Sequence, residues 1–214
     1  MKYVAIMFSL VLFFSSQIIS NNNMLFIETS EGNAVTLNWQ VTNLKTKQIQ
    51  YTLNNRPEKI TMIGKGASDS WSKESKTENI TLTRKGNIVL AEGIRDGKKI
   101  DKEIKISDLD WMASPGFYLK DFIISKEQKK YIWLINTDSL KASKMVVTKV
   151  DEYERAFNEK QEKVIVVEMK PVGLKGLLWK ASYHFISDGT YIYYKGLKGP
   201  PGTPEFVIKR MQAQ

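Results

Sequence analysis

The chain of 214 residues contains no cysteine and a single histidine, His184. Without cysteine it cannot form disulfides, which excludes a small disulfide-stapled scaffold, thiol redox chemistry and cysteine-ligated zinc. One histidine cannot supply the several imidazole ligands that transition-metal sites usually need, so we expect no metal and no cofactor. The stability of the fold must therefore come from the burial of apolar side chains and from hydrogen bonds.

Catalytic signatures are also scarce. The sequence has no Gly-x-Ser-x-Gly elbow, and its close glycines at 64–66 and 93–97 lack the strand-to-helix context of a phosphate loop. His184 falls at a polar position of a strand pattern, which indicates a structural or solvent-facing side chain. Carboxylates at 108–110 and 151–154 are compatible with glycoside hydrolysis but resemble ordinary solvated acids. We predict no catalytic residue.

Long apolar runs are confined to the beginning of the sequence. Lys2 is followed by a largely apolar stretch at 3–14 and then by small polar residues, the pattern of a secretory signal peptide. We predict a signal peptide over 1–20 and a single β-rich domain over 21–214, with an uncleaved anchor as the alternative. No cysteine follows the run, so a bacterial lipid anchor is excluded there. These features predict an exported, periplasmic protein.

Acidic residues are outnumbered by basic ones, 23 Asp and Glu against 32 Lys and Arg, for a formal net charge of +9 at pH 7. The basic residues are mostly lysines spread along the chain without a block, so we expect no nucleic-acid partner. A lysine surplus of this kind is usually a solvated surface. Contact with an anionic membrane surface is the alternative.

Strand patterns occupy most of the remaining chain. Apolar and polar residues alternate with period two at 35–42, 80–83 and 131–135, and glycine turns at 85–87 and 96–97 separate successive strands. No long amphipathic helix is indicated. About ten strand candidates predict a mainly β protein, built on a single large curved antiparallel sheet, or half-barrel, with one or two short helices. A β-sandwich is the alternative fold.

The most regular pattern lies at 177–208. Its first half is typical of a strand with one buried face, formed by Trp179, Ala181, Tyr183 and Phe185. The Ser-Asp-Gly sequence at 187–189 predicts a tight reversal, because Asp bonds its own backbone and Gly accepts positive φ. A second strand is predicted at 190–195, and a last one at 206–208 beyond a proline-rich segment.

Residues 107–128 interrupt the strand pattern. Ser114 followed by Pro115 predicts the start of a short helix. The segment also carries aromatic residues without period-two order: Trp111, Phe117, Tyr118 and Phe122. They either belong to a helix or loop that closes one side of the sheet, or form a mouth over an apolar cavity.

The aromatic residues are the strongest candidates for a binding site. Their simplest role is to fill the core, but a curved sheet of this size can leave a concave apolar surface that its own side chains do not cover. Such a surface would hold an acyl chain or another apolar ligand. The predicted ligand-binding residues are Trp111, Phe117, Tyr118, Phe122, Trp133, Trp179 and Tyr183.

Several short motifs resemble those of one protein family. They are Leu178 to Tyr183, Ser187-Asp188-Gly189, Tyr194-Lys195-Gly196 and the proline-rich 199–204, and upstream Trp111, Tyr118-Leu119 and Tyr131-Ile132-Trp133. Over residues 60–210 this pattern is similar to a family of exported bacterial proteins known as a domain of unknown function. The resemblance implies a half-barrel like that of periplasmic lipoprotein carriers, in which a curved sheet wraps an apolar interior capped by short helices. It supplies no catalytic residue.

We rank three functions on these grounds. The first is a non-catalytic binding or carrier module for a lipid or other apolar ligand. The second is a structural or protein-interaction protein of the cell envelope, with an envelope protein as its partner. The third is a carboxylate-based hydrolase.

Overall fold

The structure, a computed structural model, describes residues 22–30, 33–43, 48–53, 56–63, 69–197 and 203–211. The described strands form one 15-stranded sheet with the order β8-β7-β6-β5-β4-β3-β2-β1-β15-β14-β13-β12-β11-β10-β9. This arrangement confirms the predicted single large β-sheet and excludes the β-sandwich. The strands outnumber the predicted ten or so because short or polar strands, such as β9 (Trp111–Met112) and β5 (Ser70–Glu74), carry no period-two signal.

The first half of the sheet is a meander, in which each strand pairs with the next along the chain. Its other strands are β1 (Asn22–Ser30), β2 (Asn33–Asn43), β3 (Gln48–Leu53), β4 (Arg56–Ile63), β6 (Glu78–Lys85), β7 (Ile88–Arg95) and β8 (Lys98–Lys105). The turn between β7 and β8 is the predicted two-residue reversal. Asp96 and Gly97 both have positive φ, 49° and 75°. A two-residue hairpin turn requires this conformation to match the right-handed twist of the flanking strands.

The second half contains the longer hairpins and the helical segments. Its strands are β10 (Lys129–Asn136), β11 (Lys141–Phe157), β12 (Lys160–Pro171), β13 (Ala181–Ile186), β14 (Tyr191–Leu197) and β15 (Glu205–Arg210), and its helical segments are α1 (Pro115–Tyr118), α2 (Lys120–Ile124) and the 3₁₀ turn η2 (Leu174–Leu177). β9 pairs with β10 in parallel, whereas the other neighbours are antiparallel. Strand β13 begins later than predicted, so Trp179 precedes it.

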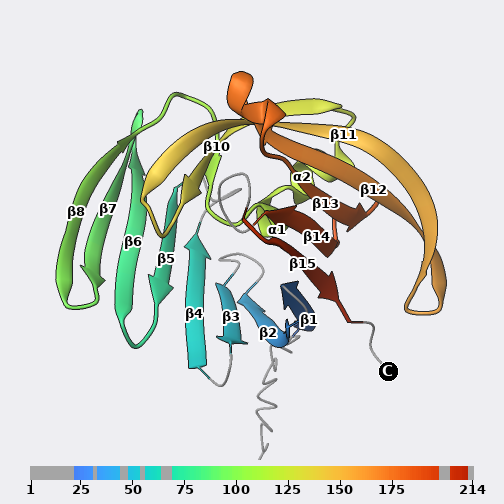
Figure 1. Cartoon of the computed structure of the whole chain (residues 1–214), viewed down its shortest axis with the longest axis horizontal. Helices are drawn as coiled ribbons and strands as arrows, with labels where there is room; N and C mark the ends of the chain where they lie inside the picture. The colour runs from blue at the N-terminus through green and yellow to red at the C-terminus, as the bar shows by residue number, and fades with distance from the viewer. Residues whose placement is uncertain are drawn as a thin grey trace, which may run out of the picture.

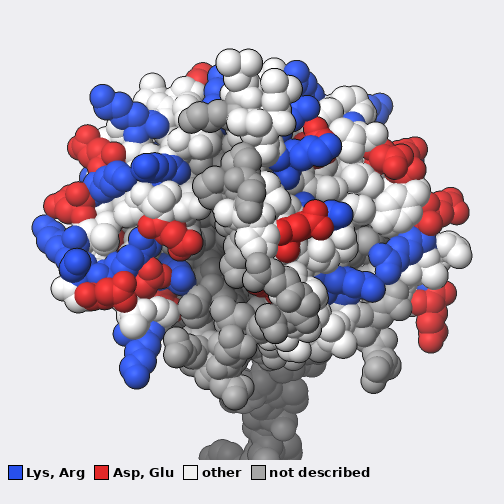
Figure 2. Space-filling model, in the orientation of Figure 1, with Lys and Arg blue, Asp and Glu red and all other residues white. Residues whose placement is uncertain are grey.

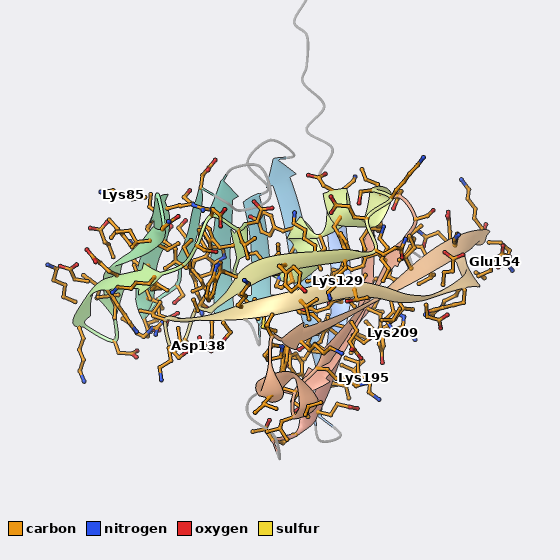
Figure 3. All side chains as sticks on the ribbon, turned by 90° about the horizontal axis from the view of Figure 1, so that it is seen from above. Lys85, Lys129, Asp138, Glu154, Lys195 and Lys209 are labelled. Carbon is orange, nitrogen blue, oxygen red and sulfur yellow. The ribbon has the colours of Figure 1, made fainter. Side chains whose placement is uncertain are left out.

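The sheet bends into an arch, and the helices α1 and α2 lie within its curve (Figure 1). The two halves are joined where β1 pairs with β15, with Phe26 opposite Arg210. Because β8 and β9 stand at the two ends of the strand order, the sheet is not closed into a barrel. Figure 3 shows how far β11 extends: Asp138 lies at the turn that precedes the strand, and Glu154 lies near the opposite end.

The main hydrophobic core connects both halves of the sheet to the helices. Phe26 of β1, Trp71 of β5, Leu82 of β6, Phe122 of α2 and Phe185 of β13 are all buried in it. Burial of each such side chain contributes about 1.5–3 kcal/mol. Among the described residues no helix has the length and apolar character needed to cross a bilayer.

The helices are held by contacts from the sheet. Pro115 occupies the first turn of α1, which confirms the predicted helix start. Lys149 of β11 donates hydrogen bonds to the carbonyls of Ile123 (3.0 Å) and Ser125 (2.6 Å) at the C-terminal end of α2. Its ammonium also lies 5.0 Å from the centre of the Phe122 ring. A cation at this end of a helix satisfies carbonyls that have no partner within the helix.

Two arginines of the meander reach the second half of the sheet. Arg84 donates to the carbonyl of Ser107 at 3.0 Å. Arg95 donates to the carbonyl of Thr137 at 2.6 Å and to that of Asp138, in the turn between β10 and β11. Hydrogen bonds from charged donors contribute about 1.5–3 kcal/mol each. The hydrogen bonds of Arg95 therefore fix the β10–β11 turn against the far end of the meander.

Glu78 forms the best shielded ion-pair cluster among the described residues. Its carboxylate meets Lys73 at 2.9 Å and also contacts Arg95, and its side chain is mostly buried. Burial alone raises the pKa of Glu78, but hydrogen bonds and the charges of Lys73 and Arg95 outweigh that effect and lower the pKa below its usual value. The ionised form is thus more stable in the folded than in the unfolded chain.

This lowered pKa predicts a loss of stability in acid. The contribution of Glu78 is fully present above its unfolded pKa of about 4.3 and disappears as the pH falls through the lower folded value. Urea unfolding should therefore show a smaller loss of stability below about pH 4 for Glu78→Gln than for the wild type. Glu74→Gln, at an exposed position of β5, is the control and should behave as the wild type. Identical pH profiles for Glu78→Gln and the wild type would contradict the assignment.

Candidate ligand pocket

A pocket of about 900 Å³ lies between the β10–β11 hairpin and the strands β13–β15. Residues at the start of α1, at the end of β12 and just before β13 complete its wall. Its lining residues are Ala113, Pro115, Leu134, Ile135, Asn136, Thr137, Ser139, Lys141, Ser143, Met145, Pro171, Leu178, Trp179, Tyr183, Tyr194, Leu197 and Phe206. Ligand pockets of proteins typically measure about 300–1,000 Å³, so this volume is suited to a small organic ligand.

Part of the pocket wall is a continuous aromatic surface. Tyr183 of β13 and Tyr194 of β14 meet edge to face with ring centres 4.8 Å apart, and Tyr194 lies 4.9 Å from Phe206 of β15. The three rings come from neighbouring strands and face the same side of the sheet. Trp179 and Met145 line the same pocket. Such a surface favours contact with an aliphatic or aromatic group over contact with water.

The two tyrosines in this wall are uncharged at neutral pH. Burial raises the pKa of the Tyr183 hydroxyl well above its usual value, and the neighbouring Tyr194 and Tyr191 raise it further. Burial also raises the pKa of Tyr194 to about 12. The wall therefore offers apolar ring faces with neutral hydroxyl groups and no negative charge.

The polar lining residues apart from the tyrosines all come from the β10–β11 hairpin. The Oδ1 atom of Asn136 accepts hydrogen bonds from the backbone N–H (2.8 Å) and the hydroxyl (2.9 Å) of Ser139, which fixes the shape of the turn. Among the described residues that line the pocket, Lys141 alone is charged. The pocket thus combines an aromatic wall with a polar hairpin that carries a single cation.

A second pocket of about 520 Å³ shares Leu178, Trp179 and Leu197 with the first. It is also lined by Ser182 and Lys195, which alternate with Tyr183 and Tyr194 along their strands. Successive side chains of a strand point to opposite faces, so the second pocket lies on the outer face of the sheet. Its charged lining residues pair with one another, Lys180 with Glu168 at 3.0 Å and Lys195 with Glu205 at 3.2 Å.

The structure separates the predicted ligand-binding residues into groups. Trp179 and Tyr183 line the larger pocket. Trp111, Tyr118 and Phe122 are buried in the main core and line neither of these two pockets.

The last two predicted residues are partly buried against the same core. The rings of Phe117 and Tyr191 meet edge to face with their centres 6.0 Å apart. Trp133 donates a hydrogen bond from its indole nitrogen to the hydroxyl of Ser107 at 3.0 Å. Neither Phe117 nor Trp133 lines one of the two pockets.

The fold is similar to a solved structure, the crystal structure of a β-barrel-like protein of the domain of unknown function DUF1849 from Brucella abortus. The two structures superpose with a TM-score of 0.62 over 89% of this chain and 95% of the other, at 7% sequence identity. Comparison with models of protein families and with curated proteins finds no match. The likeness confirms the predicted β fold as one that occurs in a domain of unknown function. At this identity the likeness extends to the fold alone.

Sequence reasoning missed several residues of the pocket wall. Phe206 lies in a segment where a strand was predicted and Met145 lies in β11, but no local signal showed that these two strands would face one another across a pocket. The sequence pattern did not reveal the face of Tyr194 because β14 contains a bulge. Tyr193 pairs with His184 and Tyr191 pairs with Phe185, so Ile192 is the extra residue. The bulge places Tyr191 and Tyr194 on the same face, which strict alternation does not allow.

The carboxylates offered by the sequence are not gathered at either pocket. Asp110 pairs with Lys130 at 2.7 Å, and Glu152 pairs with Lys163 at 2.8 Å. The described residues contain no cluster of three or more His, Asp or Glu side chains that could hold a metal ion. His184 contacts the hydroxyl of Tyr153 at 3.0 Å and the edge of the Tyr193 ring, on the outer face of β13. Nothing in this arrangement corresponds to a catalytic triad or a carboxylate pair.

Proposed function

We propose that the protein is an exported, non-catalytic binding or carrier protein for a lipid or another amphipathic apolar ligand. The observation that carries the proposal is the pocket of about 900 Å³ whose aromatic wall of Tyr183, Tyr194 and Phe206 is combined with a polar hairpin. Apolar pockets with a few convergent polar groups are typical of small-molecule sites. Export is supported by the apolar run at the beginning of the sequence.

The distribution of charge in the pocket favours an anionic head group. Of the lining residues that the structure describes, Lys141 is cationic and none is acidic. An acyl chain against the aromatic wall with a carboxylate or phosphate toward the β10–β11 hairpin satisfies both parts of the pocket. A fluorescent fatty acid should therefore bind more tightly than its uncharged methyl ester. The difference should shrink as the salt concentration rises, because salt screens exposed charges.

We expect Trp179→Ala to weaken the binding of a fluorescent fatty acid by about tenfold or more, because a large ring is removed from the pocket wall. Trp133→Ala is a matched control, since Trp133 is also partly buried but lies outside the pocket. Fluorescence titration should show near wild-type affinity for this control. Absence of fatty-acid binding by the wild type, or equal losses in the two variants, would contradict the proposal.

The second candidate, recognition of an envelope protein through a sheet edge, is less well supported. β8 is an edge strand, but it carries Lys98, Lys99, Lys102 and Lys105 and is mostly exposed. Lysines on an edge strand oppose pairing with another strand. Figure 2 shows basic and acidic side chains interspersed on the face it displays, as expected for a solvated surface.

A further inference from the structure

The most exposed apolar side chains of the described residues are gathered on one short turn. Leu174 is 84% exposed, Leu177 82% and Leu178 66%, and Val172 beside them is also exposed. The turn contains η2, the short orange coil at the top of Figure 1, and Val172 and Leu178 lie on either side of it. Uncharged side chains form the same tip in the space-filling view, with basic side chains nearby (Figure 2). Contiguous exposed apolar residues of this kind mark an interaction site.

The turn is a built feature of the backbone. Val172 donates from its backbone N–H to the carbonyl of Lys144 at 2.9 Å, and Gly176 donates to that of Gly173 at 3.0 Å. Gly173 has a φ of +84°, and a Cβ on Gly176 would lie 2.3 Å from the carbonyl oxygen of Pro171. The positive φ favours glycine at 173, and the close approach of the carbonyl oxygen leaves no room for a side chain at 176. The leucines are therefore presented outward by a defined conformation.

Basic residues flank the exposed leucines in the sequence. The sequence from 170 to 180 contains Lys170, Lys175 and Lys180 and no acidic residue. Glu168 is the neighbouring acid, and it is already paired with both Lys170 and Lys180, each at 3.0 Å. The local charge is therefore positive. Apolar side chains among lysines are the combination that binds the interface of an anionic bilayer.

The shape of the turn favours a bilayer over a protein partner. A stable protein interface buries about 800 Å² on each partner, which a single protruding turn does not supply by itself. Insertion into a bilayer needs no complementary groove, because acyl chains adapt to the side chains that enter them. Leu178 belongs both to the exposed tip and to the wall of the larger pocket. A tip inserted into lipid would thus bring the pocket against the membrane.

We propose that residues 172–178 form a membrane-docking turn that inserts Leu174 and Leu177 into the surface of an anionic lipid bilayer, so that the ligand pocket is loaded or emptied there. Lys170 and Lys180, which flank the segment, bind the lipid phosphates. This inference rests on the proposed function for its purpose, but the docking itself can be measured separately.

The test is flotation of the protein, purified as cells export it, with vesicles of phosphatidylethanolamine and phosphatidylglycerol. We expect Leu174→Ser combined with Leu177→Ser to lower the vesicle partition coefficient by at least about tenfold, because two large apolar side chains no longer leave water. The matched control is Ile94→Ser combined with Ile124→Ser, two residues exposed by 54% and 57% outside the turn. It should bind vesicles as the wild type does. Binding should also weaken when phosphatidylcholine replaces phosphatidylglycerol.

Fatty-acid titration in solution separates this inference from the proposed function. If the wild type binds the fatty acid but no vesicles, or if both double variants bind vesicles equally well, the docking turn is wrong and the pocket assignment stands. If the wild type binds vesicles through the leucines but no fatty acid, docking stands and the carrier function fails. Loss of a crosslinked envelope protein in the leucine variant, with vesicle binding unchanged, would identify a protein docking site and overturn the inference.

Discussion

Replacement of Phe122 by serine should lower the free energy of unfolding by about 4 kcal/mol, the usual cost of removing a large buried aromatic side chain. The ring is 3% exposed, packs in the main core, and receives the Lys149 ammonium on its face at 5.0 Å. Serine would leave a cavity and would also bury a hydroxyl group. Urea unfolding followed by tryptophan fluorescence measures the change.

Phe117→Ser is the matched comparison in the same segment. Phe117 is only partly buried and touches Tyr191 edge-on, so we expect a loss of about half the size. The pair also tests the alternative in which residues 107–128 form a mouth. If Phe122→Ser abolished fatty-acid binding while stability changed by less than about 1.5 kcal/mol, the segment would be a mouth and its place in the core would be wrong.

Substitution of Gly93 by alanine should destabilise the protein by about 3 kcal/mol or more. Gly93 lies within β7 with a φ of +143°, a conformation that essentially only glycine adopts. A Cβ at this position would lie 1.9 Å from the carbonyl oxygen of Asn79 on the neighbouring strand. Because that atom belongs to the backbone, the clash can be relieved only by moving a strand. Thermal unfolding should show a correspondingly lower midpoint.

Gly97→Ala is the control for this effect. Gly97 has a φ of +75° in the turn between β7 and β8, but a Cβ there would have no atom within 4 Å. Gly97→Ala should therefore lower the free energy of unfolding only by the strain of the left-handed conformation, about 1 kcal/mol. A similar loss for both variants would show that the backbone conformation, and not the close approach of β6, restricts Gly93.

The sequence determined the local elements of this protein. The alternation of apolar and polar residues between 80 and 106, with Asp96 and Gly97 at a turn, was enough to predict three paired strands. The Ser-Asp-Gly sequence at 187–189 predicted the reversal that the structure shows, where Asp188 accepts a hydrogen bond from the backbone N–H of Thr190 at 2.7 Å and Gly189 has positive φ. Pro115 predicted a helix start. These signals are legible because they depend on neighbours a few residues apart.

The tertiary structure alone decided the pairing of β1 with β15, the bulge at Ile192 and the pocket. Each depends on residues far apart in the chain, such as Met145 and Phe206, whose meeting is set by the register and curvature of the whole sheet. Whether an apolar residue is core, pocket wall or exposed tip is settled in the same way. Phe122 is buried, Trp179 lines the pocket and Leu174 faces solvent, although all three are large and apolar, because burial depends on what the rest of the sheet brings against each side chain.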